Sequence, residues 1–290
     1  MRLKALVPWG FLAPAVIVFT ALGIWPIVRT VVLSLTNTVG TRGDGAFIGL
    51  ENYVRLAGDR YFLEAFQHTV IWIVFNLTVP VALALFLALM LNRAVQSKVL
   101  KTMFFIPLAL SAPAIATIWT FIYQQDTGLI DVVLNAVGLG QLQQQWLGPD
   151  WVLLSLMIAG AWRETAFFMV IFLAGLTSVP EELVEAARID GANRRQVFRH
   201  VTIPALRPAT MIVMSSAFIG ALLTTDLVLA MTKGGPFGQS DVLGYRMYVV
   251  SFFNGEFGYG AAIGVVIAVI AAAFVIPYLL RMNRMQEEEN

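Results

Sequence analysis

Cysteine is absent from this chain, and charged residues make up only 13% of its 290 positions. Without cysteine the protein has no disulfide, no thiolate metal site and no cysteine nucleophile. Soluble domains carry about 25% charged and roughly 45–50% apolar residues, whereas this chain is 58% hydrophobic, with a mean hydropathy of +0.76. The shortage of charge excludes a soluble globular domain and a disordered chain, and the net charge of +1 gives no field for nucleic acid. The composition predicts a polytopic membrane protein.

Six apolar stretches are each long enough to cross a bilayer as a helix, which takes about 20 residues. They are Trp9–Leu33, Val70–Leu91, Met103–Tyr123, Trp151–Leu176, Ala209–Met231 and Ala261–Leu280. Each is continuously apolar rather than alternating, which disfavours barrel strands. The predicted fold class is an all-α polytopic membrane protein with six transmembrane helices. No separate soluble domain is visible, so residues 1–290 are expected to form a single transmembrane domain.

The distribution of Lys and Arg predicts the orientation, because cytoplasmic loops are enriched in basic residues. Connections on one side of the six stretches contain twelve Lys and Arg, and those on the other side contain five. The richer side holds both termini and the long connection Val179–Pro208, so we expect all three in the cytoplasm. The first stretch is longer than the roughly 7–15 residues of a signal-peptide core, which favours an uncleaved span.

The connection Val179–Pro208 is the least apolar part of the chain and contains five of the 19 basic residues. Pro180 and the acidic residues after it suit the first turn of a helix. Gly191 is a natural helix stop, and a second short helix is expected over residues 193–201. From patterning alone, this helix–turn–helix is either an amphipathic segment on anionic lipid or an ordinary folded loop.

The spacing within this loop points to a third interpretation. Glu185-Ala186-Ala187, three residues, Gly191, nine residues and then Val201-Thr-Ile-Pro204 resembles the EAA motif of ABC-importer permeases, with Val and Ile in place of Ile and Leu. The resemblance implies that residues 179–208 form a coupling loop whose first helix sits in a cleft of an ATPase subunit. The residues it implies for coupling are Glu185, Ala186, Ala187, Asp190, Gly191, Arg194, Phe198 and Pro204.

Three further motifs resemble the carbohydrate-uptake branch of these binding-protein-dependent permeases. Phe47-Ile-Gly-Leu-Glu-Asn-Tyr53 is similar to its F-x-G-L-x-N-Y signature, and Phe104-Phe-Ile-Pro107 also fits. Lys233-Gly-Gly-Pro236 is similar to the first-subunit type found in maltose, trehalose and glycerol-3-phosphate permeases. The resemblance implies a type I ABC importer fold in its compact six-span form, located in a bacterial or archaeal cytoplasmic membrane.

The resemblance also implies the partner proteins and which subunit hydrolyses ATP. No Walker A pattern occurs in the chain, so ATP and Mg²⁺ are expected on a separate ATPase subunit, and this chain is expected to be non-catalytic with no cofactor of its own. The implied partners are a second homologous permease, two ATPase subunits, an extracytoplasmic solute-binding protein, the sugar substrate and membrane lipid. The two histidines, His68 and His200, fall on opposite sides of the predicted membrane, so no metal site is expected.

Charged residues inside the predicted spans are candidates for function, because burying one in a bilayer costs at least ~2.5–3.5 kcal/mol. They form either a structural ion pair, such as Arg163 with Asp226, or a polar cavity that binds sugar hydroxyls while aromatic rings stack on the sugar. The resemblance implies that the fourth and fifth spans line the substrate path. The candidate path residues are Trp162, Arg163, Glu164, Phe167, Thr224, Thr225 and Asp226.

Several alternatives remain open at this point. The preferred substrate is a disaccharide or oligosaccharide, and the second is glycerol-3-phosphate, whose anion would meet Arg163. A secondary transporter would show internal repeats, and an intramembrane enzyme would need a nucleophile and a base within the spans. Asn76-Leu-Thr78 has the form of a glycosylation sequon but lies inside a predicted span, so we expect no glycosylation there.

Overall fold

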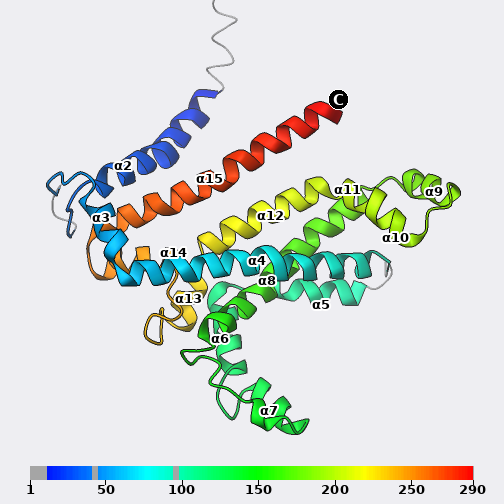
Figure 1. Ribbon diagram of the computed structural model, residues 1–290, viewed down its shortest axis with the longest axis horizontal. Coiled ribbons are helices and arrows are strands. Elements are labelled where there is room, and N and C mark those ends of the chain that lie inside the picture. Colours follow the sequence, from blue (N-terminus) through cyan, green and yellow to red (C-terminus); the bar gives the residue numbers. More distant parts are fainter. Residues whose placement is uncertain (1–11, 41–44, 94–97, 290) are drawn as a thin grey trace, which may run out of the picture. The chain divides into compact units, whose positions relative to one another are not determined.

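A computed structural model describes residues 12–40, 45–93 and 98–289 (Figure 1). Across these ranges the regular structure is helical, and the extended pairing is limited to one isolated bridge between Thr36 and Phe47. The chain divides into two compact units, Met1–Leu63 with Arg246–Ile270 and Glu64–Tyr245 with Ala271–Asn290. Each unit is described by itself below.

The first unit is built from segments at the two ends of the chain. A helix from Leu12 to Ser34 contains a π-helical turn, η1 (Thr20–Ile24), and continues as α2 (Trp25–Ser34). The unit also holds α3 (Glu51–Gly58), η4 (Val249–Phe253) and the first part of α15 (Phe257–Glu289). The predicted start of the first span, Trp9, lies outside the described residues.

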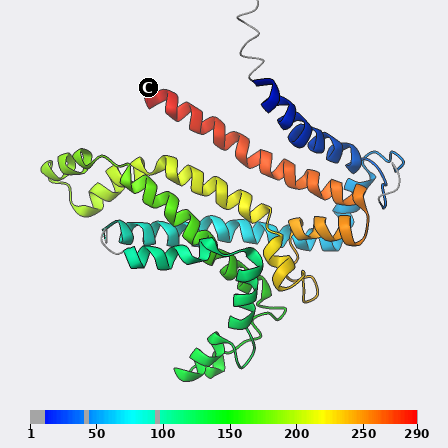
Figure 2. The ribbon, with the colours of Figure 1, turned by 180° about the vertical axis from the view of Figure 1, so that it is seen from behind.

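The second unit contains the long central helices and the loop singled out by its motif. Its elements are α4 (Arg60–Arg93, which begins in the first unit), α5 (Lys98–Ala109), α6 (Ala112–Ile122), α7 (Leu129–Ala136), η2 (Gly140–Leu142), α8 (Val152–Thr177), α9 (Glu181–Ile189), α10 (Arg194–Val197), η3 (Phe198–Thr202), α11 (Ile203–Ala205), α12 (Arg207–Leu222), α13 (Asp226–Met231) and α14 (Leu243–Tyr248, which ends in the first unit). Figure 2 shows α9 and α10 beyond the ends of α8 and α12.

Four described helices are long and apolar enough to cross a membrane: Leu12–Ser34, Arg60–Asn92, Val152–Thr177 and Phe257–Tyr278. They match the first, second, fourth and sixth predicted spans. Two bent helix pairs raise the total to as many as six if each pair counts as one span. The all-helical class is therefore confirmed.

The third predicted span, Met103–Tyr123, is wrong as a single continuous helix. The chain bends by 111° between α5 and α6. Pro113 lies in the first turn of α6, where its missing N–H is tolerated. Continued as one helix, its ring would clash with the carbonyl of residue 109, so α5 ends at Ala109.

The fifth predicted span, Ala209–Met231, is also interrupted, because α12 ends at Leu222 and α13 begins at Asp226. In the break, Thr224 Oγ1 donates to the Gly220 carbonyl at 2.8 Å, and Asp226 Oδ1 accepts from the Leu227 N–H at 2.9 Å. Such short polar side chains compete with the helix for backbone groups. The interruption therefore lies where this apolar stretch becomes polar.

The core of the second unit lies where α4, α8 and α12 pack together. Small residues such as Ala84 and Ala217 allow close approach, and Phe168 and Phe172 fill the space between the helices. A Cβ added at Gly175 would lie 2.7 Å from the Ala209 Cβ. The three helices therefore form a tight scaffold between the break in the fifth span and the loop after α8.

Candidate functional site

A small polar cavity lies beside the break between α12 and α13. Its volume is about 50 Å³. The polar residues around it are Arg163, Glu164, Thr224 and Asp226, and the apolar residues are Trp72, Ala112, Ile115, Gly160 and Leu227. Four of the seven predicted path residues therefore surround one cavity in an otherwise apolar bundle.

The carboxylate of Glu164 is held by a residue that sequence reasoning missed. Asn76, which is 2% exposed, donates from Nδ2 to Glu164 Oε2 at 2.8 Å and to the Ala217 carbonyl at 2.9 Å. One amide thus joins α4 to α8 and α12. The signal was present in the sequence, because a polar side chain in the middle of an apolar span needs a partner.

Arg163 and Asp226 are exposed in this chain, although both lie in predicted spans. The described side chains do not place them within ion-pair distance, and Asp226 Oδ1 instead accepts from the Leu227 N–H in the first turn of α13. A charged side chain in a membrane span is costly against lipid. We therefore expect water or a polar subunit surface around Arg163 and Asp226.

Trp162, Phe167 and Thr225 do not line this cavity. Trp162 contacts Trp119, with ring centroids 6.1 Å apart, in an apolar groove of about 380 Å³. Phe167 is 41% exposed and contacts its neighbour Phe168, while Thr225 Oγ1 donates to the Leu223 carbonyl at 3.3 Å. Helical geometry explains the separation, because consecutive residues point about 100° apart.

In the loop after α8, the first helix is unburied along its whole length. None of the residues of α9 is buried, and its apolar side chains Leu183 and Ile189 are 53% and 85% exposed. Gly191 follows at φ +84°, a conformation that non-glycine residues rarely adopt. The N–H groups of Gly191 and Ala192 donate to the carbonyls of Arg188 and Ala187. The predicted helix stop at Gly191 is confirmed.

The second part of the loop is anchored to the unit. Asn193 caps α10 in a capping box with Gln196, and Val197 beyond them is buried. Phe198 and Pro204 are half-buried, and Arg194 is exposed. The predicted second helix is correct in place, but after Val197 it continues as the π-helix η3.

Two grooves flank α9 in this loop. One, of about 720 Å³, is lined by Arg188, Arg194 and Phe198 among others, and the second, of about 520 Å³, by Glu181, Glu185 and Arg188 among others. Of the remaining predicted coupling residues, Ala186 and Asp190 are exposed and Ala187 is half-buried. The loop therefore presents an exposed helix beside two adjoining grooves, which share Val184 and Arg188 of α9.

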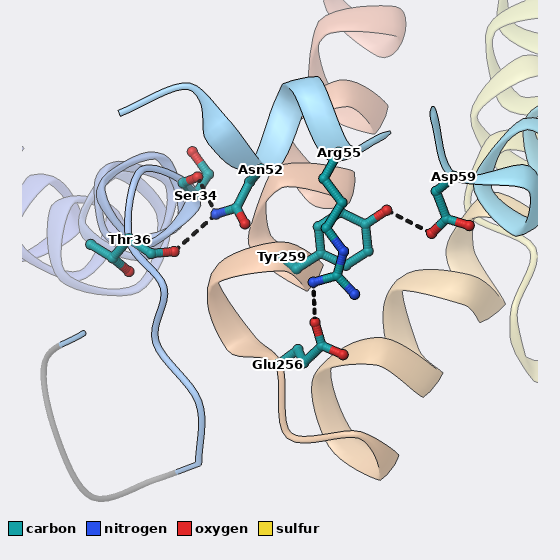
Figure 3. A network of polar contacts seen from close by, with 7 residues as sticks. All are labelled: Ser34, Thr36, Asn52, Arg55, Asp59, Glu256 and Tyr259. Carbon is teal, nitrogen blue, oxygen red and sulfur yellow. Dashed lines mark hydrogen bonds and ion pairs between the residues drawn. The ribbon is translucent and has the colours of Figure 1, made fainter. Parts of the chain in front are cut away.

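The segment Phe47–Tyr53 fastens the outer part of the first unit. Asn52 is buried and donates from Nδ2 to the carbonyls of Ser34 and Thr36 at 2.8 and 2.9 Å (Figure 3). Tyr53 Oη lies 2.7 Å from Ser34 Oγ, and Gly49 has φ +61°. The residues of this signature therefore hold the end of the first helix against α3.

A second polar group in the first unit joins α3 to the start of α15 (Figure 3). Arg55 donates to Glu256, and its guanidinium lies 3.9 Å from the ring centroid of Tyr259, whose hydroxyl donates to Asp59 at 2.6 Å. The hydrogen bond to Glu256 raises the pKa of Arg55 above its ordinary value. These contacts brace α3 on the polar side of the unit.

The Lys233–Pro236 motif forms a tight loop in the second unit. Lys233, Gly234, Phe237 and Gly238 all have positive φ, and Ser240 Oγ donates to the Gly235 carbonyl at 2.6 Å. Phe237 is 85% exposed. The loop is thus closed by its own hydrogen bonds and presents one aromatic ring to its surroundings.

The chain is similar to known transport proteins along most of its length. A family model described as binding-protein-dependent transport system inner membrane component matches residues 80–284. The probable ABC transporter permease protein YurN of Bacillus subtilis (strain 168) is 32% identical over 98% of each chain. The alpha-glucoside transport system permease protein AglF of Rhizobium meliloti (strain 1021) is 36% identical, covering 93% of this chain and 80% of that protein.

The fold has also been seen in a solved structure. A crystal structure of a bacterial ABC transporter involved in the import of the acidic polysaccharide alginate matches with a TM-score of 0.83 and 22% identity, covering 98% of this chain and 99% of that one. Together with the family model and the relatives, it agrees with the motifs of the loop after α8 and of the Phe47–Tyr53 segment. The chain belongs to the family of binding-protein-dependent transport system inner membrane components.

Proposed function

We propose that this chain is the first-type permease subunit of an ATP-driven importer for a neutral disaccharide or oligosaccharide. The observation that carries the proposal is the polar cavity in the apolar bundle, where Arg163, Glu164, Thr224 and Asp226 meet. Carboxylates accept hydrogen bonds from sugar hydroxyls, and a guanidinium donates to hydroxyl and ring oxygens. Trp72, on the same cavity, offers an apolar face of the kind on which sugar rings stack.

The size of the cavity supports a shared substrate path. About 50 Å³ holds one or two water molecules or a hydroxymethyl group, since a water in the liquid takes about 30 Å³. A sugar ring is larger than this. The exposed Arg163 and Asp226 therefore form one wall of the path, and a second homologous permease supplies the opposite wall.

The chemistry of the cavity favours a neutral substrate over an anionic one. Two carboxyl groups and one guanidinium line it, a set that offers more acceptor oxygens for sugar hydroxyls than cations for a phosphate group. Glycerol-3-phosphate remains the second candidate because Arg163 is exposed and guanidinium groups bind phosphate well. The relative named as an alpha-glucoside permease supports the neutral sugar.

Helix α9 is the element that we propose for coupling to an ATPase subunit. Leu183 and Ile189 are exposed apolar side chains on this polar loop, and a docked partner would bury them. Ala186 and Ala187 are small enough for close helix approach, while Glu185 lines the groove beside them. The Gly191 turn and the cap at Asn193 hold α9 at a fixed angle, so that closure of an ATPase dimer moves it as a rigid body.

The complete importer then contains two permeases, two ATPase subunits that bind ATP and Mg²⁺, and an extracytoplasmic solute-binding protein. This chain binds no cofactor and lies in the cytoplasmic membrane with its termini and α9 inside. ATP binding opens the permease pair outward to accept the sugar, and hydrolysis with product release restores the inward-facing state. The chain itself contributes half of the path and one ATPase contact.

The substrate assignment is tested by ATPase stimulation. The assembled importer is reconstituted with its binding protein, and the ATPase rate is measured with maltose, trehalose, lactose and glycerol-3-phosphate. We expect a neutral sugar to stimulate hydrolysis and to be taken up into the vesicles. Stimulation by glycerol-3-phosphate alone would select the second candidate, and transport driven by a proton gradient without ATP would overturn the proposal.

A further inference from the structure

Asn76 is buried in the middle of α4, at a place where an apolar residue would cost less. It is 2% exposed, and the residues around it in α4 are apolar. A buried amide persists in such surroundings when its hydrogen bonds are satisfied. Both side-chain hydrogen bonds of Asn76 go to other helices, to Glu164 of α8 and to the Ala217 carbonyl of α12. Asn76 therefore links α4 to two other helices.

The two oxygens of Glu164 have different surroundings. Oε2 accepts from Asn76 at 2.8 Å, whereas the described residues give Oε1 no hydrogen-bond partner. Oε1 is also not among the fully buried unpaired atoms of the described chain, and Glu164 lines the polar cavity. One oxygen is thus fixed, and the other remains available to a group in the cavity.

Gly220 of α12 lies close to the same carboxyl group. A Cβ added there would lie 3.3 Å from Glu164 Oε1 and 3.7 Å from Oε2. The shorter distance is tighter than ordinary van der Waals contact, so a methyl group would push the carboxylate aside. Because Gly220 has no side chain, the Glu164 carboxyl group can occupy the position in which Asn76 holds it.

We propose that Asn76 is a positioning residue for sugar binding, which holds Glu164 so that Oε1 accepts a hydrogen bond from a substrate hydroxyl. This inference rests on the function proposed above. Asn76 donates to Oε2 and so fixes the orientation of the carboxyl group, whose oxygens accept hydrogen bonds. The site accordingly suits hydroxyl-donating substrates, and Asn76 acts through Glu164 rather than by touching the sugar.

The test uses the importer assembled with its partner permease, ATPase subunits and binding protein in vesicles, with maltose and trehalose as probes. We expect Asn76→Ala to raise KM for uptake about tenfold to hundredfold with little change in kcat, the range of one hydrogen bond to a charged group. Gly220→Ala should raise KM as well, without touching Asn76. Thr78→Ala, which removes only the two hydrogen bonds of that hydroxyl within α4, is the matched control and should leave KM unchanged.

A double-mutant cycle separates positioning from a merely structural role. In the Glu164→Gln background, Asn76→Ala should have much less effect on KM than in the wild type, because the group that it positions is already altered. An equal effect in both backgrounds, or a loss of assembled complex with KM unchanged, would overturn the inference while leaving the proposed function intact. A wild-type importer that takes up neither sugar while importing glycerol-3-phosphate would overturn both.

Discussion

Replacing Gly191 tests whether the shape of the coupling loop matters. Gly191 has φ +84° with open space where a Cβ would stand, so Gly191→Ala changes backbone strain and adds no clash. An L-residue in the left-handed region costs about 1–2 kcal/mol, which changes the ratio of native to distorted loop roughly 5–30-fold. Asn tolerates this region better than Ala. Pro fixes φ near −65° and loses the N–H that bonds to Arg188.

The assay is the ATPase rate of the reconstituted importer with and without binding protein. Stimulation of the ATPase by the binding protein should be highest in the wild type and should fall from Gly191→Asn to Gly191→Ala. Gly191→Pro should abolish the stimulation while membrane insertion stays normal. Gly138→Ala is the matched control, because Gly138 also has positive φ and open space around it but lies in the connection before α8. A Gly191→Pro complex with wild-type stimulation would refute the reasoning.

Three further predictions concern packing and contact surfaces. Gly175→Val should lower the thermal midpoint of the purified protein by overpacking α8 against Ala209, at a cost of about 1–3 kcal/mol, and a variant as stable as the wild type would contradict the close approach. Asn52→Ala removes two buried hydrogen bonds, worth about 1–3 kcal/mol together, and should speed proteolysis near α3; unchanged cleavage would count against it. Ile189→Glu should leave the thermal midpoint unchanged, because the side chain is 85% exposed, but should prevent co-purification of the ATPase; normal recovery would argue against docking through α9.

The membrane helices could be predicted from the sequence because each is a long apolar stretch, and that signal is local. The breaks within the third and fifth predicted spans could not be predicted in this way. Pro113 was visible, but a proline is compatible with either a kink or a complete turn, so its presence alone did not predict the 111° bend between α5 and α6. In the fifth span, hydropathy averaged over Thr224 and Thr225 hides the competition of their hydroxyls with the helix.

The residues of the candidate cavity could likewise be predicted only in part. Arg163 and Glu164 were selected for their charge, and the structure places both beside Asp226 across the break. Trp162 was grouped with them as an aromatic ring that could stack on a sugar, but adjacent helical residues face different directions. Asn76 lies 88 residues from Glu164 in the chain, and nothing local in the sequence pairs them.

The loop after α8 was the part whose local structure the sequence predicted most fully. Its turn depends on a glycine at a fixed place, and its cap depends on Asn193 and Gln196, all within a few residues. Val197, which anchors the second part of the loop, is buried, and its burial is a tertiary property. The motif therefore specified the two helices and the turn but not how the second helix packs on the unit.

The most direct test of the account is a cross-link from α9 to the ATPase, because a chain without cysteine accepts a single reactive thiol. A benzophenone maleimide is attached at Ile189→Cys, where the side chain is 85% exposed, and in a separate variant at Val137→Cys, where it is 62% exposed. The account predicts a light-dependent product containing the ATPase subunit from position 189 and none from position 137. Absence of that product from position 189 in a complex that still hydrolyses ATP would contradict it.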